Sequence, residues 1–440
     1  MKINMSSIFG FDFVLYLAIQ FLMVIGIFFI YSSGVNSNGV IVSDEYIKQI
    51  IWVVTGNIIL LVVSFMDYRI IKNFAFWLYL GMLVILLLTA SFGKVVNGSK
   101  SWLGYGSLGI QPSELSKLIT IIFLSFYLES NRKYIQTFRV FCTGLLIIGL
   151  PMGLILIQPD LGTAIVFAPV FLVMMFIAGA RPRYLIMLSA AGLLTILFSM
   201  LPYYLMFMAD SPGNALILFT EQSLMTVITI TLGVISIITL IGYLFTQKGY
   251  FFYLTSFFSI TAVSYFLSFF ARKVLKEYQV MRLIVFLDPQ VDPRGSGWNI
   301  IQSVTAVGSG GAFGKGYLKG TQSHYRYLPE QSTDFIFSII SEEIGFFGNL
   351  LIIVLYMLIF WRCINIILKS QDLFGSLIAA GIVGMIFFHF MINIGMAIGI
   401  MPITGIPLIF LSYGGSSLWT TMLGIGILLS VYHRRYKNVN

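Results

Sequence analysis

The sequence predicts an all-α protein, a polytopic membrane bundle of helices. Of its 440 residues, 58% are hydrophobic and only 10% are charged, and the mean hydropathy is +0.94. A soluble domain carries roughly a quarter charged residues. Apolar runs recur along the chain at about the 20-residue length that a helix needs to cross the hydrocarbon core. Most of the chain is therefore expected to face lipid or other apolar helices.

Twelve segments are predicted to span the membrane. Eleven are apolar runs of about the required length, and the twelfth, 118–128, becomes long enough if its helix begins at Pro112–Ser113, with Ser113 as its cap. The first run lacks a small-residue cleavage pattern after it, so we expect a retained helix rather than a signal peptide. The eleven runs are 13–30, 50–66, 74–92, 141–157, 162–179, 184–201, 223–246, 251–270, 335–361, 374–398 and 416–432.

Lys and Arg residues predict the orientation of these spans. The net charge of +9 comes mainly from short clusters in alternate loops, and such loops are cytoplasmic in membrane proteins. Both termini are then cytoplasmic, and binding to nucleic acid is the weaker interpretation of the charge. The basic side holds Arg69, Lys72, Arg132, Lys133, Arg139, Arg181, Arg183, Lys248, Arg362, Lys369, Arg434, Arg435 and Lys437. The outer side holds 34–48, 93–116, 158–161, 202–222, 271–334 and 399–415.

The chain is predicted to form a single membrane domain over 1–440, with a large external loop at 271–334. It shows no internal repeat of the kind that marks many secondary transporters, and no soluble domain. Cys142 and Cys363 lie within or beside apolar runs, so they predict neither a disulfide framework nor a zinc site.

Polar residues gather in four segments at the predicted outer ends of helices. These segments are 97–117, 158–162, 286–334 and 402–417. Backbone rich in Pro and Gly is tolerated at membrane depth only where protein buries it or where it lines a wet cavity. Together the segments predict an externally open cavity, which is lined by Glu114, Lys117, Asp160 and Asp334.

Asp334 is the candidate catalytic residue. It follows Thr333, a predicted cap, so we expect it in the first turn of a helix at the outer boundary. The apolar stretch 335–361 is longer than one crossing requires, and its first turns are expected to line the cavity. A partly desolvated carboxylate has a raised pKa, which suits a general base. The alternative is an acid that only stabilises the helix dipole, and both interpretations stay open.

The other candidates also have structural interpretations. Glu114 and Lys117, at i,i+3, would form an ion pair that fixes the start of their helix, and Asp160 would pair with a lysine. Asp288 and Asp292 each precede a proline, an ordinary turn signal.

Two further features give weaker signals. The run Gly308–Gly311 would cradle a phosphate through its amides, but it lacks a Walker pattern. His389 stands alone on an apolar helix and is expected to be a hydrogen-bonded packing residue rather than a ligand.

The four segments together resemble the SEDS family (shape, elongation, division and sporulation), the group containing RodA, FtsW and SpoVE. The resemblance covers nearly the whole chain, and the glycine runs 308–311, 314–316 and 320–322 are closer to its elongation branch. The matching strings are Gly98–Trp102, Gln111–Glu114 with Lys117, Gln158–Gly162, Asp292–Trp298, Leu328–Glu330, Thr333–Phe337 and Ser412–Ser416.

The resemblance implies ten family helices, two fewer than the sequence predicts. The surplus maps to 202–270, a probable inserted transmembrane hairpin that turns at Gln247–Gly249, before the large loop and the eighth family helix. Interfacial helices are the alternative.

The resemblance also implies peptidoglycan glycosyltransfer, in which lipid II is joined into glycan strands for cell-wall elongation and cell shape. The family's essential acid falls on Asp334, and other positions used for activity or for the central cavity fall on Trp102, Glu114, Lys117 and Asp160. Glu330 belongs to the same motif as Asp334 and is included in the predicted substrate cavity.

In the expected reaction, Asp334 removes the proton of the acceptor 4-hydroxyl as it attacks C1 of a donor carrying undecaprenyl pyrophosphate. Lys117, with Lys315 or Arg326, would stabilise the pyrophosphate. A divalent cation would do the same work, but no ligand cluster in the sequence identifies one.

The implied partners are a class B penicillin-binding protein, which is a transpeptidase, and other membrane proteins of the elongation complex. A lipid-linked precursor flippase and a non-catalytic scaffold of that complex are the alternatives. A flippase should carry polar residues through to the cytoplasmic side, whereas here they concentrate at the outer ends.

Overall fold

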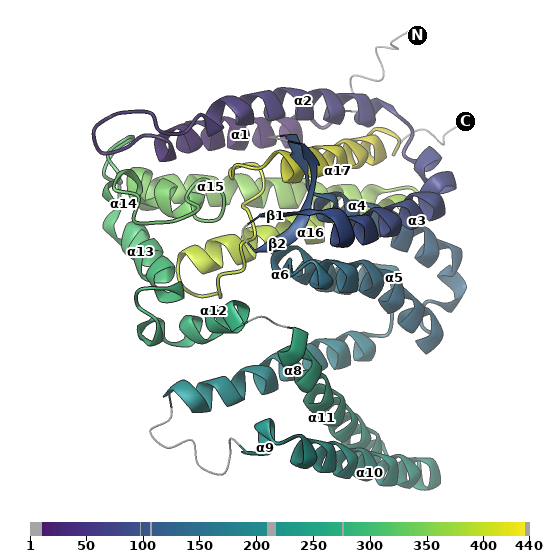
Figure 1. Cartoon of the computed structure of the whole chain (residues 1–440). Helices are drawn as coiled ribbons and strands as arrows, with labels where there is room; N and C mark the ends of the chain where they lie inside the picture. The colour runs from purple at the N-terminus through teal and green to yellow at the C-terminus, as the bar shows by residue number, and fades with distance from the viewer. Residues whose placement is uncertain (1–10, 97, 106–107, 209–216, 275–276, 436–440) are drawn as a thin grey trace. The chain divides into compact units, whose positions relative to one another are not determined.

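The computed structural model describes residues 11–96, 98–105, 108–208, 217–274 and 277–435. It divides into two compact units, Met1–Ala180 with Asn299–Asn440, and Arg181–Trp298. A long helix forms at each of the twelve predicted spans (Figure 1). The all-α prediction is therefore confirmed, and Lys437, on the predicted basic side, lies outside the described residues.

The first unit contains nine of these spans among its described residues. One span is interrupted, because α6 (Leu161–Ile165) and α7 (Phe167–Ala178) are separated by a single residue. The other helices are α1 (Phe13–Ser33), α2 (Glu45–Phe65), α3 (Arg69–Phe92), α4 (Pro112–Ser130), α5 (Phe138–Ile157), α15 (Ile336–Lys369), α16 (Leu373–Ala397) and α17 (Gly415–His433).

The α4 helix differs from the other spans in polarity. It begins at Pro112, as predicted, but it is absent from the eleven helices of the described chain that are long and apolar enough to cross a membrane. Its acidic and basic residues lower its hydropathy, and most of its side chains, Glu114 and Lys117 included, are buried inside the unit. Ser113 does not cap the helix, contrary to prediction, because Gln111 occupies the cap position.

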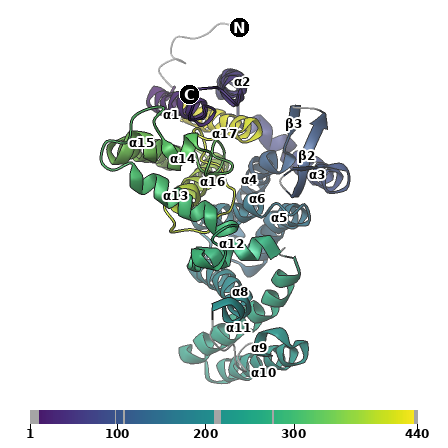
Figure 2. The ribbon, with the colours of Figure 1, turned by 60° about the vertical axis from the view of Figure 1, so that its left-hand side comes forward.

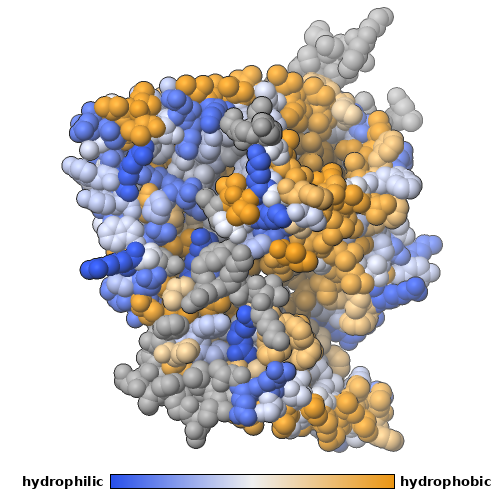
Figure 3. All heavy atoms as spheres, in the orientation of Figure 1, coloured by the Kyte–Doolittle hydropathy of each residue, from blue (hydrophilic) through white to orange (hydrophobic). Residues whose placement is uncertain are grey.

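Packing in the first unit separates an inner pair of helices from outer ones. α16 and α17 are the most buried of the apolar spans, whereas only 22% of the apolar stretch of α2 and 28% of that of α3 are buried. Figure 3 shows hydrophobic side chains gathered over α3, whose exposed residues include Phe74, Trp77 and Leu88. Exposed apolar side chains of this kind are what a lipid-facing helix presents.

Ion pairs join the predicted basic loops of the first unit at one end of its helices. They are Arg69–Asp372 (3.3 Å), Arg434–Asp67 (3.4 Å) and Arg362–Asp12 (2.7 Å). Alternate loops therefore share one end, as the charge pattern predicts. The assignment of that end to the cytoplasm stays a prediction.

The second unit contains α8 (Pro182–Met208), α9 (Ile217–Thr220), α10 (Gln222–Thr246), α11 (Gly249–Val274) and α12 (Glu277–Leu287). α10 and α11 pack side by side and turn at Gln247, whose φ is 55° (Figure 1). Both are long and apolar enough to span a membrane, which favours a transmembrane hairpin over interfacial helices. The span predicted to end at 201 continues in α8 through Pro202 to Met208, into the predicted outer loop 202–222. Residues 209–216 of the predicted loop 202–222 lie outside the described residues. That the hairpin is an insertion stays a prediction.

Two predicted loops contain regular structure. The segment 271–334 holds α12, α13 (Ser296–Ser309) and α14 (Thr321–His324). The segment 93–116 holds a small antiparallel sheet of β1 (Lys94–Val96), β2 (Ser99–Tyr105) and β3 (Leu108–Ile110). β2 packs beside α3 (Figure 2).

Candidate active site

Asp334 lies in a turn two residues before α15. Its main-chain N–H donates to the carbonyl of Glu330 (3.1 Å), and Glu330 adopts a left-handed conformation with φ of 47°. The prediction that Thr333 caps the helix is wrong, because its hydroxyl donates to the same Glu330 carbonyl (3.3 Å) and the helix begins only at Ile336. The Asp334 side chain is half-buried, whereas Phe335 and Ile336 after it are buried.

The backbone of this turn is held from two directions. The buried side-chain amide of Asn393, on α16, donates 2.8 Å hydrogen bonds to the carbonyls of Asp334 and Ile406. The N–H of Tyr413 donates to the carbonyl of Ser332 (2.8 Å). Both contacts tie the turn to the 398–414 segment between α16 and α17, named here the α16–α17 loop.

Asp160 caps α6 and collects hydrogen bonds from the start of α4. Its carboxylate accepts from Gln111 Nε2 (2.8 Å), Ser113 Oγ (3.2 Å) and Thr163 Oγ1 (2.9 Å), and from Thr163 N (3.1 Å). No lysine is among these partners, so the predicted pairing with a lysine is replaced by a cluster of neutral donors. Next to it, a Cβ on Gly162 would lie 2.7 Å from Thr404 O, so α6 also packs closely against the α16–α17 loop.

Glu114 and Lys117 form the predicted ion pair, with the ammonium 2.8 Å from Glu114 Oε1 and both side chains buried. Lys117 Nζ also lies 3.2 Å from His389 Nε2, and His389 Nδ1 lies 3.0 Å from Pro407 O. A lysine ammonium only donates and a carbonyl only accepts. His389 is therefore a neutral imidazole that donates from Nδ1 and accepts at Nε2, which confirms its hydrogen-bonded packing role.

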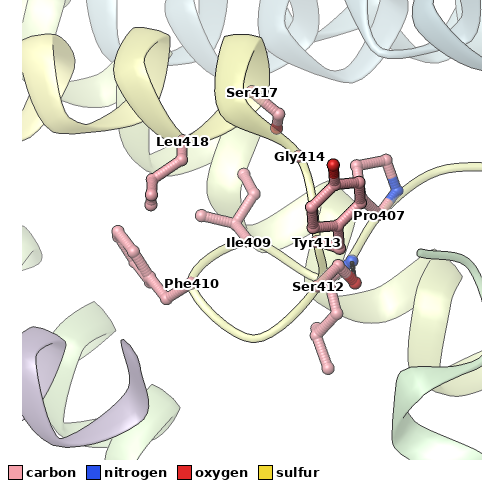
Figure 4. A pocket seen from close by; sticks show the side chains of 9 residues that line it. Pro407, Ile409, Phe410, Ser412, Tyr413, Gly414, Ser417 and Leu418 are labelled. Carbon is pink, nitrogen blue, oxygen red and sulfur yellow. Dashed lines mark hydrogen bonds between the residues drawn. The ribbon is translucent and has the colours of Figure 1, made fainter. Parts of the chain in front are cut away.

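The four predicted cavity residues thus converge on the α16–α17 loop. Asp334 reaches it through Asn393, Lys117 through His389, and Asp160 through the close approach of Gly162. A small recess beside this loop is lined by Pro407–Phe410, Ser412–Gly414, Ser417 and Leu418 (Figure 4). None of the four predicted cavity residues is among these lining residues. The loop is the structural centre of the site.

A second cluster of polar residues, around Glu342 and Glu343, lies inside α15 and was not predicted from the sequence. This helix is interrupted at Gly345 (φ 68°), and the glycine-rich segment 310–316 fills the break. The N–H groups of Lys315 and Gly316 donate to the carbonyls of Glu342 and Glu343 (2.9 and 3.0 Å). Of the run Gly308–Gly311, which was predicted to cradle a phosphate, Gly311 contacts α15 through its carbonyl, which accepts from the N–H of Phe346 (2.9 Å).

The side chains of Glu342 and Glu343 bind Lys315 of this segment, the residues just after it, and α1. Glu342 accepts from Lys315 Nζ (2.7 Å) and from the N–H of Thr321 (2.8 Å), and Glu343 accepts from Ser32 Oγ (2.5 Å). Two adjacent carboxylates inside an apolar run are costly unless they have partners. That cost was the signal in the sequence that could have identified them.

The remaining predicted residues lie elsewhere. Trp102, on β2, packs its ring over Gly109 of β3. Glu330 and Arg326 are exposed, and both have positive φ. In the second unit, Asp288 accepts from Gln290 N (2.9 Å) and Asp292 from Gly295 N (3.0 Å), as the turn interpretation predicts.

Comparison with known proteins gives consistent relatives over the whole chain. The family model for the FtsW, RodA and SpoVE cell cycle proteins matches residues 13–211 and 214–437. The peptidoglycan glycosyltransferase RodA of Treponema pallidum is 48% identical, over 97% of this chain and 98% of its own. Stage V sporulation protein E of Bacillus subtilis is 34% identical, over 96% of each chain.

Solved structures share the fold. A chain from a peptidoglycan synthase complex that coordinates polymerization and crosslinking aligns with a TM-score of 0.67 at 25% identity, over 97% of this chain and 99% of that one. The crystal structure of RodA from Thermus thermophilus aligns with a TM-score of 0.59 at 24% identity, over 97% and 98%. The resemblance that the motifs predicted is confirmed: this chain belongs to the FtsW/RodA/SpoVE family of cell cycle proteins.

Proposed function

We propose that this chain is a peptidoglycan glycosyltransferase that polymerises lipid II into glycan strands during cell-wall elongation and the control of cell shape. Relatives that are 48% and 30% identical, from Treponema pallidum and Escherichia coli, carry the name peptidoglycan glycosyltransferase. The fold is that of a multi-pass membrane protein.

The observation that carries the mechanism is a half-buried aspartate on a fixed backbone. The N–H of Asp334 donates a hydrogen bond to the carbonyl of Glu330, and the carbonyl of Asp334 accepts one from the side chain of Asn393. The next two residues are buried. The Asp334 carboxylate would take the proton of the acceptor 4-hydroxyl as the oxygen attacks C1 of the donor. The bond from C1 to the pyrophosphate oxygen breaks in the same step. A positioned base of this kind contributes roughly 10²- to 10⁴-fold in rate.

The leaving pyrophosphate needs positive charge. Lys117 and Lys315 are paired with Glu114 and Glu342, whereas Arg326 is exposed in the loop that leads to Asp334. We therefore assign the first contact to Arg326, with Lys315, which is partly exposed, as the second. A divalent cation on the pyrophosphate stays part of the proposal; the described residues contain no cluster of three His, Cys, Asp or Glu that could hold a metal.

The proposed setting is the bacterial inner membrane, with both termini cytoplasmic and Asp334 facing outward. A class B penicillin-binding protein would crosslink the strand, and other membrane proteins of the elongation complex would join it. The structural relative from a complex that coordinates polymerization and crosslinking supports this partner.

The test is a polymerisation assay on purified protein with lipid II, in which glycan length is read on a gel. We expect wild type to produce a ladder and Asp334→Asn to lose at least about 10²-fold in rate. Asp44→Asn is the matched control, because Asp44 precedes α2 and its side chain makes no cap hydrogen bond.

Three results would count against the proposal. Wild-type yield from Asp334→Asn would remove Asp334 from the chemistry. Transfer of lipid II across vesicles without polymer formation would favour the flippase alternative. Neither polymer nor transfer, in the presence of the transpeptidase partner, would favour a scaffold.

A further inference from the structure

We propose that Asn393 is a positioning residue for the reaction: its amide holds the backbone of Asp334 against the α16–α17 loop. This inference rests on the proposed function, since it concerns the placement of the base. Asn393 does not act on substrate in this proposal; it acts through Asp334.

Asn393 joins two irregular segments of the chain from a membrane-spanning helix. Asn393 is fully buried on α16, and its Nδ2 donates to the main-chain carbonyls of Asp334 and Ile406, both at 2.8 Å. An amide nitrogen carries two hydrogens, so both are used. The two acceptors lie in irregular segments far apart in sequence, and the side-chain amide replaces the backbone partner that a helix or sheet would supply.

A second side chain on the same face of α16 also binds the α16–α17 loop. His389, one helical turn before Asn393, bonds the next carbonyl of the loop, that of Pro407 (3.0 Å). Residues four apart lie on the same face of a helix. Asn393 also donates a hydrogen bond to the Asp334 turn, whereas the second ring nitrogen of His389 is hydrogen-bonded to Lys117.

Removal of this contact would leave two carbonyls without their side-chain donor, that of Ile406 in a buried place and that of Asp334 in a part-buried one. The cost of unpaired buried carbonyls would drive the turn and the loop apart until water or another donor reaches them. Misplacement of a catalytic group by about 1 Å costs roughly 10²-fold in rate. The expected consequence is therefore slower chemistry rather than weaker lipid II binding.

The main variant is Asn393→Leu, which keeps a similar volume and removes both donors. Asn57→Leu is the matched control, because Asn57 is an amide in α2 that pairs with Gln20 of α1. Asn393→Ser, with one hydroxyl donor, is the milder variant if the leucine protein is poorly folded. Each protein is assayed for lipid II polymerisation and for hydrogen–deuterium exchange of the peptides covering 330–339 and 405–413.

We expect Asn393→Leu to lower kcat by roughly 10- to 100-fold while KM changes little, and to speed exchange in both peptides. Asn393→Ser should fall between it and wild type, and Asn57→Leu should leave both peptides and kcat as in wild type.

Faster exchange with unchanged kcat would overturn the positioning role, and so would a lower kcat with unchanged exchange. Failure of wild type to polymerise lipid II would contradict the proposed function instead. The exchange measurement does not depend on activity, so the two failures are distinguishable.

Discussion

Lys315 and Glu342 are joined twice across the break in α15. The main-chain N–H of Lys315 donates to the carbonyl of Glu342 (2.9 Å), and its ammonium lies 2.7 Å from the Glu342 carboxylate. A helix that is interrupted leaves N–H and C=O groups without partners. Here the glycine-rich segment supplies them, so the loop and the helix are expected to be stable only together.

Replacement of Glu342 by leucine should destabilise the protein strongly. The fully buried carboxylate accepts from the Lys315 ammonium and from the N–H groups of Thr321 and Gln322. These donors would lose their acceptor, at a cost of about 3 kcal/mol. Thermal unfolding in detergent measures the change, and Glu221→Leu, at an exposed residue, should stay within about 0.5 kcal/mol of wild type. Equal unfolding temperatures for the two variants would contradict this account.

Gly314→Ala should be far more harmful than Gly39→Ala. Both glycines have nearly the same φ (77° and 76°), so both pay the cost of a left-handed residue, about 1–2 kcal/mol. A Cβ on Gly314 would lie 2.1 Å from Glu343 O, whereas a Cβ on Gly39 meets nothing within 4 Å. The difference in unfolding free energy between the two variants therefore measures the cost of the contact between the added Cβ at position 314 and the Glu343 carbonyl. The interpretation fails if the two variants unfold alike.

Lys117→Met should destabilise the first unit by about 3–5 kcal/mol, because it leaves the Glu114 carboxylate buried without a cation. The double variant Glu114→Gln with Lys117→Met removes that charge and should recover much of the loss. Denaturant unfolding of both single variants and the double variant gives the coupling energy. Additive losses would show that the pair contributes no coupling.

The Tyr317 hydroxyl predicts a loss of stability at high pH. Burial, followed by the negative charge of Glu343, raises its pKa to about 12 from 10. The folded state therefore favours the protonated phenol; this contribution is complete below about pH 10 and is lost as the pH rises toward 12. Tyr317→Phe should flatten the fall in unfolding midpoint over this pH range. An unchanged slope would assign the pH dependence to other groups.

The positions of the helices were predictable because each depends on a local property, an apolar run of membrane-spanning length. The Glu114–Lys117 pair was predictable for the same reason, since i,i+3 spacing places both on one helix face. The partners of Asp334 were not, because Asn393 lies 59 residues away and packing alone brings it near. The start of α15 was misplaced because the left-handed Glu330 closes a turn that the sequence does not signal.

The interruption of α15 also limits the depths at which this helix can insert in the bilayer. Its 34 residues span about 51 Å at 1.5 Å per residue, well beyond a hydrocarbon core of about 30 Å. A continuous rod of that length could slide between several insertion depths. The glycine-rich segment closes on Gly345, so we expect the part of α15 after the break to be the crossing segment. We therefore expect these glycines, about 20 residues earlier in the chain, to set the height of Asp334 relative to the lipid headgroups, where a substrate with a polyprenyl anchor would present its sugar.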